Sequence, residues 1–199
     1  MELREVVRRR RMVRRFDPRP LPADVLDRIL HSATRAPSAG FSQGLDLLVL
    51  EGPEAVRDFW RATADPRFGK PYSTATPPVL VLVLSDKQAY LDRYGEPDKA
   101  GLGMDTEAGW PVPYWDMDAA MAVMLMLLTA VDEGVGAWWF GVFHGAEALL
   151  RDLGVPPGRR LVGVVALGYP AADDRPGGSA RTRPRRPVDQ VVHRGRWRR

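Results

Sequence analysis

Apolar residues recur at helical spacing in several stretches of the chain. The clearest stretch is 21–36, where one face is apolar and Pro37 follows as a helix stop. The pattern also favours helices at 53–63, where a proline stands near the first turn, and at 145–154, which ends in glycine. These patterns predict short amphipathic helices that each bury one side.

Continuous apolar runs between turn residues predict buried strands. Such runs lie at 45–52, 77–85, 136–143 and 160–170. The run at 77–85 is apolar almost throughout, which is typical of a strand that is covered on both faces. We therefore expect 77–85 to be a central strand.

The stretch from Trp115 to Glu133 predicts one long helix that is apolar on almost every face. Its methionines are Met117, Met121, Met124 and Met126. A helix with so little polar surface must be covered all round, and in a chain of 199 residues a second subunit is the expected cover. The alternative is a helix buried in the core of its own chain.

Two stretches show little periodicity. Residues 86–115 are rich in Gly, Pro, Asp and Tyr, which predicts a long excursion or lid. The tail, 171–199, lacks a core of its own, although its end, VVHRGRW, has a strand-like composition. We expect the tail to lie on another surface.

Length and composition indicate one globular domain over 1–199, since 45% of the residues are hydrophobic and 27% are charged. The longest apolar run, Ala119–Val131, is shorter than the roughly 18 residues that a membrane crossing needs. The beginning of the chain lacks the apolar stretch of a secretory signal, so we expect a cytoplasmic protein. The chain contains no cysteine, which excludes thiolate chemistry. Its three histidines lie far apart in the sequence and give no support for a metal site.

The net charge of +4 is unevenly distributed. Residues 1–15 carry a net +5 and residues 175–199 a net +8, which leaves −9 for the rest of the chain. Basic arms that bind nucleic acid usually lack apolar residues, whereas these ends contain residues such as Val13, Phe16 and Trp197. We predict that both ends are ordered and partly buried, with nucleic-acid binding as the weaker alternative.

Residues that could bind a ligand are concentrated in four stretches: RRMVRR at 10–15, APSAGFSQG at 36–44, WWFGVF at 138–143 and RTRPRRP at 181–187. Separated arginine clusters offer bidentate forks for a phosphate, and a loop with Ser38, Ser42 and Gln43 offers neutral donors and acceptors. Taken singly, the loop could be a helix stop and the arginines a solvated tail. Together they favour a phosphate-bearing cofactor with a polar heterocycle.

In these stretches the chain resembles the FMN-dependent nitroreductase-like flavoproteins. RRMVRRFDPRPLP resembles the opening of that family, and APSAGFSQG resembles its Ala-Pro-Ser-x-x-Asn-x-Gln loop. Further similar segments are GVGAWWFGVF, LGVPPGRRLVGVVALGYP and RPRRPVDQVVHRGRW. The resemblance covers about 6–197 and is weaker at 60–115. It implies an α+β fold, an α/β sandwich whose mostly antiparallel central sheet is flanked by helices, in an obligate homodimer whose C-terminal extension packs on the partner subunit.

The resemblance also implies which residues contact FMN near the ends of the chain. Arg14 is expected to approach the pyrimidine edge of the flavin and to stabilise the reduced form, which makes it the catalytic candidate. The residues expected beside the ribityl phosphate are Arg10, Arg11, Met12, Arg183 and Arg185.

Two further groups of flavin contacts follow from the resemblance. From the partner subunit, the expected contacts are Pro37, Ser38, Gly40 and Gln43. The backbone of Phe140, Gly141 and Val142 is expected to face N5 of the ring. Two residues depart from the family pattern: Met12 replaces a usual serine, and Phe41 a common asparagine. The stretch GLDLL also replaces the usual Pro-Trp.

The resemblance implies an FMN oxidoreductase that takes two electrons from NADH or NADPH and passes them, in a ping-pong sequence, to a nitroaromatic, a quinone or a similar electron-poor small molecule. Deazaflavin-dependent reduction, dehydrogenation and dehalogenation on the same scaffold are the alternatives. Lys70 could reach the flavin. Several aromatic residues could stack on a flat substrate or simply pack together: Tyr72, Tyr94, Trp110, Tyr114 and Trp115.

Overall fold

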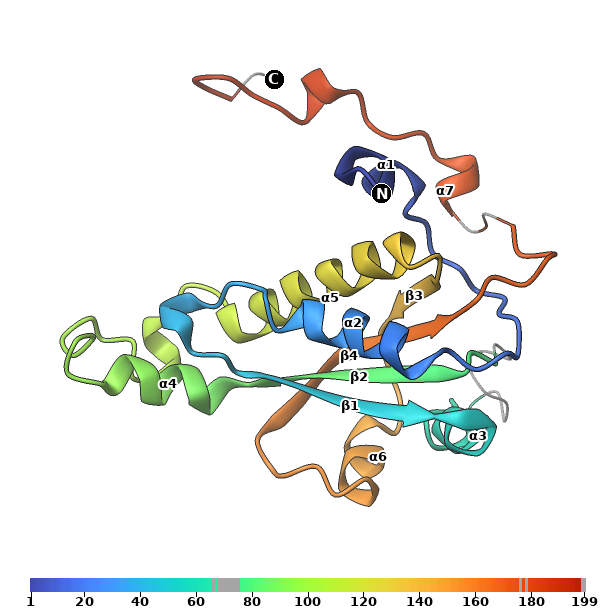
Figure 1. The fold of residues 1–199 in the computed structure, drawn as a ribbon. Helices are drawn as coiled ribbons and strands as arrows, with labels where there is room; N and C mark the ends of the chain where they lie inside the picture. Colours follow the sequence, from blue (N-terminus) through green and yellow to red (C-terminus); the bar gives the residue numbers. More distant parts are fainter. Residues whose placement is uncertain (66, 68–75, 176, 178, 198–199) are drawn as a thin grey trace.

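The structure is a computed structural model that describes every residue except 66, 68–75, 176, 178 and 198–199. Lys70 and Tyr72 therefore lie outside the described residues. The strands form one antiparallel sheet in the order β1-β2-β4-β3 (Figure 1). Their bounds are β1 Leu45–Glu51, β2 Val79–Asp86, β3 Gly136–Phe140 and β4 Arg159–Gly168.

Helices surround this sheet. The α-helices are α1 Leu3–Arg9, α2 Ala23–Ala33, α3 Gly52–Ala62, α4 Lys87–Gly95, α5 Tyr114–Asp132, α6 Ala146–Asp152 and α7 Ser179–Thr182. Short 3-10 turns are η1 Ala39–Phe41, η2 Glu107–Gly109 and η3 Val188–Gln190. The predicted helices and strands of the core are confirmed, with small shifts at their ends; the strand expected at 136–143 stops at Phe140.

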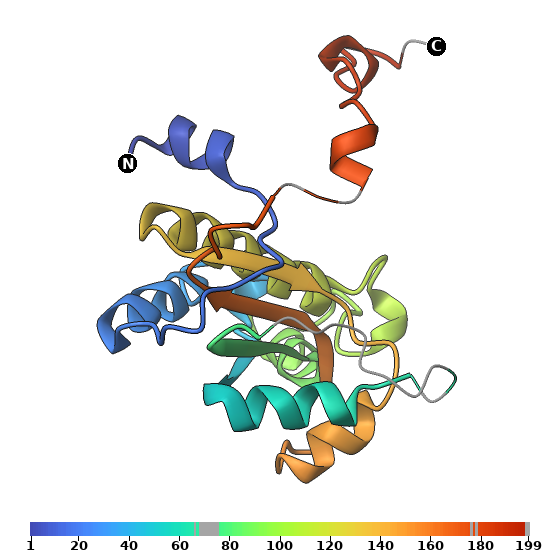
Figure 2. The ribbon, with the colours of Figure 1, turned by 90° about the vertical axis from the view of Figure 1, so that its right-hand side faces the viewer.

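Alternate residues of β2 face two separate cores, because successive side chains of a strand point to opposite faces. Val81 and Val83 pack with α2 and α5, whereas Leu80 and Leu82 pack with α3 and α6. The two helical layers lie on opposite sides of the sheet (Figure 2). This arrangement confirms the predicted central strand and the helix-flanked antiparallel sheet.

Helix α5 has one buried side and one exposed apolar side. Ala122 and Met126 are fully buried, whereas Met117, Met121 and Met124 are 47%, 41% and 47% exposed. Among the described residues, α5 is the helix long and apolar enough to cross a membrane by length and composition, but 44% of that window is buried inside the chain. Its inner side is therefore core, and its outer side is an uncovered methionine stripe.

The excursion at 86–115 is more ordered than its sequence pattern predicts. It contains α4, which Asp86 caps by accepting the N–H of Gln88. Three aromatic side chains form a small core of their own here: Tyr90, Trp110 and Trp115. Tyr94 and Tyr114 pack against this core, so these candidate stacking aromatics contact one another.

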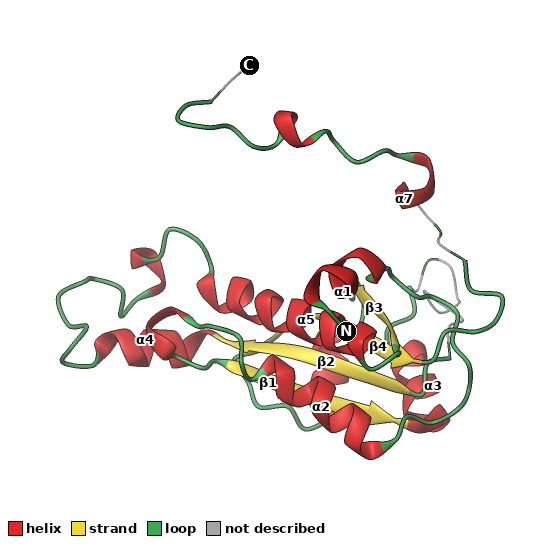
Figure 3. Cartoon of the chain, turned by 45° about the horizontal axis from the view of Figure 1, so that its top comes forward, coloured by secondary structure: helices red, strands yellow, loops and turns green. Residues whose placement is uncertain are grey.

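The two chain ends behave differently. Val6, Val13 and Phe16 are buried, which confirms the ordered N-terminal end. The tail instead leaves the body of the molecule (Figure 3), and its apolar residues are exposed: Val188, Val191, Val192 and Trp197. The predicted strand in VVHRGRW is wrong, because no strand among the described residues pairs with that segment, and its apolar side chains are not buried within one chain.

Candidate cofactor site

The arginine-rich segment is held against β3 by its apolar residues. Val13 is 3% exposed, and its N–H donates to the carbonyl of Ala137 at 2.9 Å. A Cβ on Gly136 would lie 2.8 Å from a methyl group of Val13, so only glycine leaves room for this approach. The segment therefore extends the edge of the sheet at this point.

The same segment also meets the end of β4. Phe16 is buried and forms an isolated bridge with Pro170, and the N–H of Asp17 donates to Tyr169 at 2.8 Å. The apolar side chains thus point inward from an extended backbone while Arg14 and Arg15 point outward. This alternation explains why arginines stand beside residues that are buried.

Asp174 is the anion that fixes the segment. Its side chain is 2% exposed, pairs with the Arg11 guanidinium, and accepts the backbone N–H groups of Arg14 at 3.2 Å and Arg15 at 3.0 Å. Burial would raise the pKa of Asp174, but the hydrogen bonds from Arg11 and the two N–H groups outweigh it and lower the pKa. Arg11 is therefore neutralised inside the chain.

Arg10 and Arg14 have no carboxylate partner in the part of the chain that the structure describes. The guanidinium carbon of Arg14 lies 5.6 Å from the ring centroid of Trp138 on β3, which is a cation–π contact. The sulfur of Met12 accepts the N–H of Trp139 at 3.4 Å. Arg14 is thus a cation beside β3 that no carboxylate among the described residues neutralises, and Met12 is bound to the strand itself.

The end of β3 combines buried aromatic rings with an open backbone. Phe140 is buried and stacks on Trp60 at a centroid distance of 5.3 Å. Gly141 and Val142 follow without regular structure, and Phe143 is 78% exposed. Because residues after Phe140 lie outside the sheet ladder, their backbone groups are available to a ligand.

The loop that contains Pro37, Ser38, Gly40 and Gln43 adopts a strained conformation. Gly40, Phe41 and Gln43 have φ values of 61°, 58° and 53°. For residues other than glycine, this left-handed region costs roughly 1–2 kcal/mol each. The loop contains bonds that offset this cost: the Ser38 hydroxyl accepts the Gln43 N–H at 3.0 Å, and the Ser42 hydroxyl donates to Ala39 at 2.7 Å.

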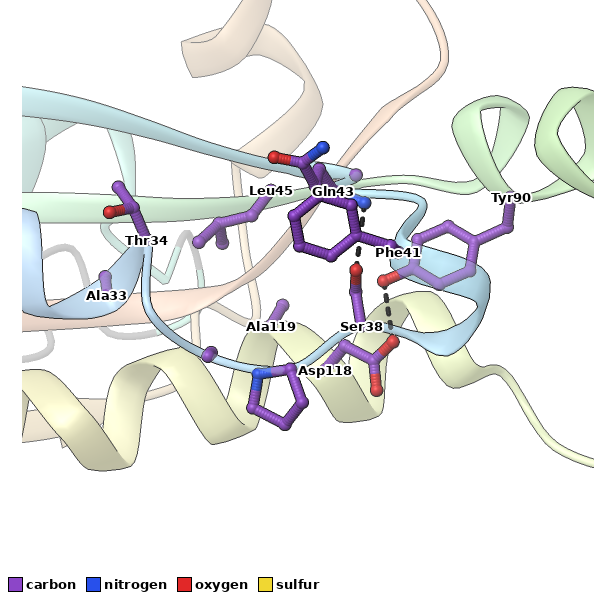
Figure 4. Close-up of a pocket in the computed structure, with 12 residues that line it drawn as sticks. Ala33, Thr34, Ser38, Phe41, Gln43, Leu45, Tyr90, Asp118 and Ala119 are labelled. Carbon is purple, nitrogen blue, oxygen red and sulfur yellow. Dashed lines mark hydrogen bonds between the residues drawn. The ribbon is translucent and has the colours of Figure 1, made fainter.

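Helices α4 and α5 support this loop from below. Asp118 of α5 accepts the Ala39 N–H at 2.9 Å and the Tyr90 hydroxyl at 2.8 Å, and Arg93 donates to the Gly40 carbonyl at 2.9 Å. A pocket of about 160 Å³ opens beside the loop (Figure 4). Its lining includes Ala33, Pro37, Ser38, Phe41, Gln43 and Ala119.

The structure places the predicted cofactor contacts in three separate regions. The loop rests on Asp118 near the start of α5, whereas the arginine-rich segment meets β3 just after α5 ends. From Asp118 to Asp132 the helix rises about 21 Å at 1.5 Å per residue. Arg183 and Arg185 follow α7 in the tail, which leaves the body of the molecule (Figure 3). One chain therefore does not bring the three groups together.

Two residues of the site escaped the sequence interpretation. Asp118 had a signal, since it and Asp116 are carboxylates near the start of a largely apolar helix. Asp174 had none, because nothing in the sequence pairs it with Arg11, 163 residues away.

Comparisons with known proteins agree with this architecture. The sequence model of the nitroreductase family matches residues 7–169. An NADH dehydrogenase of Thermus thermophilus is 29% identical over 202 residues, covering 92% of this chain and 91% of that protein. An NADPH-dependent oxidoreductase of Staphylococcus aureus is 26% identical over 194 residues, covering 96% and 72%.

A solved structure shares the fold. The crystal structure of a nitroreductase with bound FMN from Bacteroides fragilis superposes with a TM-score of 0.67 at 24% identity, and the match covers 87% of this chain and 90% of that one. The resemblance seen in the sequence motifs is therefore confirmed. Since the family match spans most of the residues and includes both the arginine-rich segment and the sheet, the chain belongs to the nitroreductase family.

Proposed function

We propose that the protein is a homodimeric flavin oxidoreductase that binds FMN and takes electrons from NADH or NADPH. The observation that carries this proposal is the arginine-rich segment held against β3, in which Arg10 and Arg14 have no carboxylate partner among the described residues. Like charges held together in this way favour an anionic ligand, and the FMN phosphate is such a ligand. FMN in the related B. fragilis protein supports the same cofactor.

The two arginines fit the phosphate of FMN and the edge of its ring that becomes negative on reduction. Arg10 would bind the phosphate, and Arg14 would hold a positive charge near the pyrimidine edge, where reduction places negative charge. Arg11 would line the same side but act mainly through its pair with Asp174. The backbone of Phe140, Gly141 and Val142 would face N5, as the irregular backbone there allows.

A second copy of the chain would complete the site. In a two-fold dimer that packs the methionine stripes of α5 antiparallel, the start of one helix lies beside the end of the other. Ser38, Gly40 and Gln43 of one chain would then reach the arginine-rich segment of its partner. The tail, 171–199, would pack on the partner and bring Arg183 and Arg185 to the phosphate. In this arrangement the loop of one chain lies beside the arginine-rich segment of its partner, although the two are about 20 Å apart within one chain.

When bound, FMN supplies the redox chemistry, accepting two electrons from the nicotinamide donor and passing them to an electron-poor acceptor such as a nitroaromatic or a quinone. The residues of the chain bind the cofactor, orient it and stabilise its charge. No nucleophile of the protein is required. NADH and NADPH are the donor classes named for the related T. thermophilus and S. aureus proteins.

The proposal is tested by reconstitution. We expect a yellow protein with an absorption band near about 450 nm that bleaches when NADH or NADPH is added without oxygen. A protein that stays colourless with excess FMN rejects the cofactor. If neither NADH nor NADPH bleaches the flavin but a reduced deazaflavin does, the deazaflavin takes the place of the nicotinamide as donor, and the FMN assignment stands.

A further inference from the structure

A buried carboxylate lies below the candidate cofactor loop without a cationic partner among the described residues. Asp118 is 6% exposed and stands on the side of α5 that faces the loop (Figure 4). Its Oδ2 atom accepts two hydrogen bonds, from the Ala39 N–H at 2.9 Å and from the Tyr90 hydroxyl at 2.8 Å. A buried polar group is costly unless it is hydrogen-bonded, so these two donors define the environment of Asp118.

The first donor belongs to the strained part of the loop. Ala39 immediately precedes Gly40 and Phe41, which both have left-handed backbone conformations. Such conformations persist only where the surroundings determine them. The bond from Ala39 to Asp118 joins this part of the loop to a long, rigid helix.

The second donor ties Asp118 to α4. Tyr90 is 1% exposed, and burial together with the Asp118 carboxylate raises its pKa far above the ordinary value, so its hydroxyl stays a donor. The neighbouring residues of α4 also reach the loop. Arg93 donates to the Gly40 carbonyl, and a Cβ on Gly40 would lie 2.7 Å from the ring of Tyr94. Asp118 thus stands where α4, α5 and the loop meet.

We propose that Asp118 is the positioning residue of the cofactor loop, which holds Ser38, Gly40 and Gln43 in the conformation that contacts the flavin across the dimer interface. The inference rests on the proposed function, because it assumes that the loop reaches FMN. Asp118 itself touches no cofactor in this arrangement. It acts through the Ala39 N–H, and Tyr90 fixes the direction of its carboxylate.

The position of Asp118 links the loop to the interface helix. Met117 and Met121, which belong to the exposed stripe, lie one residue before and three residues after Asp118 on α5. The helix that we propose to pack on its partner therefore also carries the anchor of the loop. As a result, the placement of the loop relative to the flavin of the partner follows the placement of α5.

The test uses variants of each partner in the dimeric holoenzyme. Asp118→Ala leaves the Ala39 N–H without its acceptor. We expect it to weaken FMN binding about tenfold, to alter the visible circular dichroism of the flavin, and to accelerate hydrogen exchange at 39–43 at least tenfold. Asp118→Asn keeps one side-chain oxygen that accepts both bonds and should restore most of the FMN affinity. Tyr90→Phe should give a smaller effect of the same kind.

Two controls separate positioning from general stability. Leu149→Ala removes a buried side chain of α6, distant from the loop, and should lower the melting temperature without changing exchange at 39–43 or the flavin spectrum. Asp92→Asn makes the same chemical change as Asp118→Asn at an exposed position of α4 and should resemble the unchanged protein. Equal loop exchange in Asp118→Ala and Leu149→Ala would overturn the proposal.

The measurements also separate this inference from the proposed function. If the unchanged protein binds no FMN, the proposed function fails, while hydrogen exchange in the apoprotein still tests whether Asp118 holds the loop. If the unchanged protein binds FMN, and Asp118→Ala speeds exchange without weakening FMN or altering its spectrum, the positioning role is rejected and the proposed function stands. Faster exchange at 39–43 together with weaker FMN binding in Asp118→Ala, both largely restored in Asp118→Asn, supports the inference.

Discussion

The backbone N–H of Arg15 donates to the carboxylate of Asp174 at 3.0 Å, although 159 residues separate them in the sequence. Asp174 also accepts the N–H of Arg14 and pairs with the Arg11 guanidinium. The root of the C-terminal tail is therefore joined to the arginine-rich segment inside one chain. This junction sets which arginines remain free for a ligand.

Asp174→Ala should lower the free energy of unfolding by about 2–3 kcal/mol, because a buried acceptor of charged and backbone donors is lost. Urea denaturation of the apoprotein measures this change. Asp173→Ala is the matched control, since Asp173 pairs with Arg15 on the surface, where such pairs contribute about 0–1 kcal/mol. Equal losses in the two variants would contradict the assigned role of Asp174.

The stability of the protein should also depend on Asp174 in acid. Its pKa in the folded state is lowered, because hydrogen bonds from Arg11 and from the backbone outweigh the effect of burial. A group of this kind stabilises the fold fully above its unfolded pKa of about 3.9, and the contribution is lost as the pH falls through the lower folded value. Unfolding measured between pH 6 and pH 2.5 should show a steeper acid loss for the unchanged protein than for Asp174→Asn. Parallel curves would exclude this contribution.

Arg14 and Arg183 should affect different steps. Arg14→Ala should slow anaerobic reduction of the flavin by roughly 10-fold to 100-fold while changing FMN affinity less, since its charge acts where reduction adds negative charge. Arg183→Ala should weaken FMN binding about tenfold and leave the reduction rate nearly unchanged. Stopped-flow absorbance and fluorescence titration give the two quantities. If each variant changed the reduction rate and the FMN affinity equally, this division of roles would be refuted.

The exposed methionine stripe predicts the oligomeric state. Met121→Asp places a charge at the centre of the proposed interface and should convert the dimer to a monomer that binds FMN poorly. Met121→Leu keeps the apolar surface and should remain dimeric. Light scattering after gel filtration gives the mass, and far-ultraviolet circular dichroism confirms that each variant is folded. A dimer that survives Met121→Asp would place the interface elsewhere.

Phe41 should be a site of stored strain. Its backbone is left-handed, with φ of 58°, and its ring is 72% exposed. Asparagine tolerates this conformation, so Phe41→Asn should stabilise the apoprotein by roughly 0.5–1 kcal/mol. Phe143→Asn removes a ring of similar exposure, 78%, from a position without positive φ and should give no such gain. Urea denaturation compares them; equal gains would mean that exposure of the ring, and not backbone strain, is responsible.

Much of the core followed from local pattern, whereas several surface elements did not. The strand β2 and the helix α5 were predicted because their apolar residues are continuous or repeat over many positions. Helix α4 was missed, since its stability comes from Tyr90 packing against Trp110 and Trp115 of later sequence. The end of the tail, VVHRGRW, was predicted as strand-like from composition, but a strand needs a neighbouring strand, and the described residues provide none there.

The candidate site divides in the same way. The sequence located the arginine-rich segment and the Ser38 loop, and it flagged Arg14, because residue type and spacing are visible in a linear chain. It did not separate Arg11, which pairs with Asp174, from Arg10 and Arg14, which have no carboxylate partner among the described residues. That distinction depends on Asp174, which only the folded chain brings to them.

The sequence by itself determined which core segments are helical or extended, which faces are apolar and which family the chain resembles, because those properties are read from neighbouring residues. The tertiary structure decided which charges are compensated, how Asp118 holds the strained loop, and that the loop lies far from the arginines within one chain. These properties arise from contacts between residues remote in sequence, whose energies depend on distance and burial in the folded molecule.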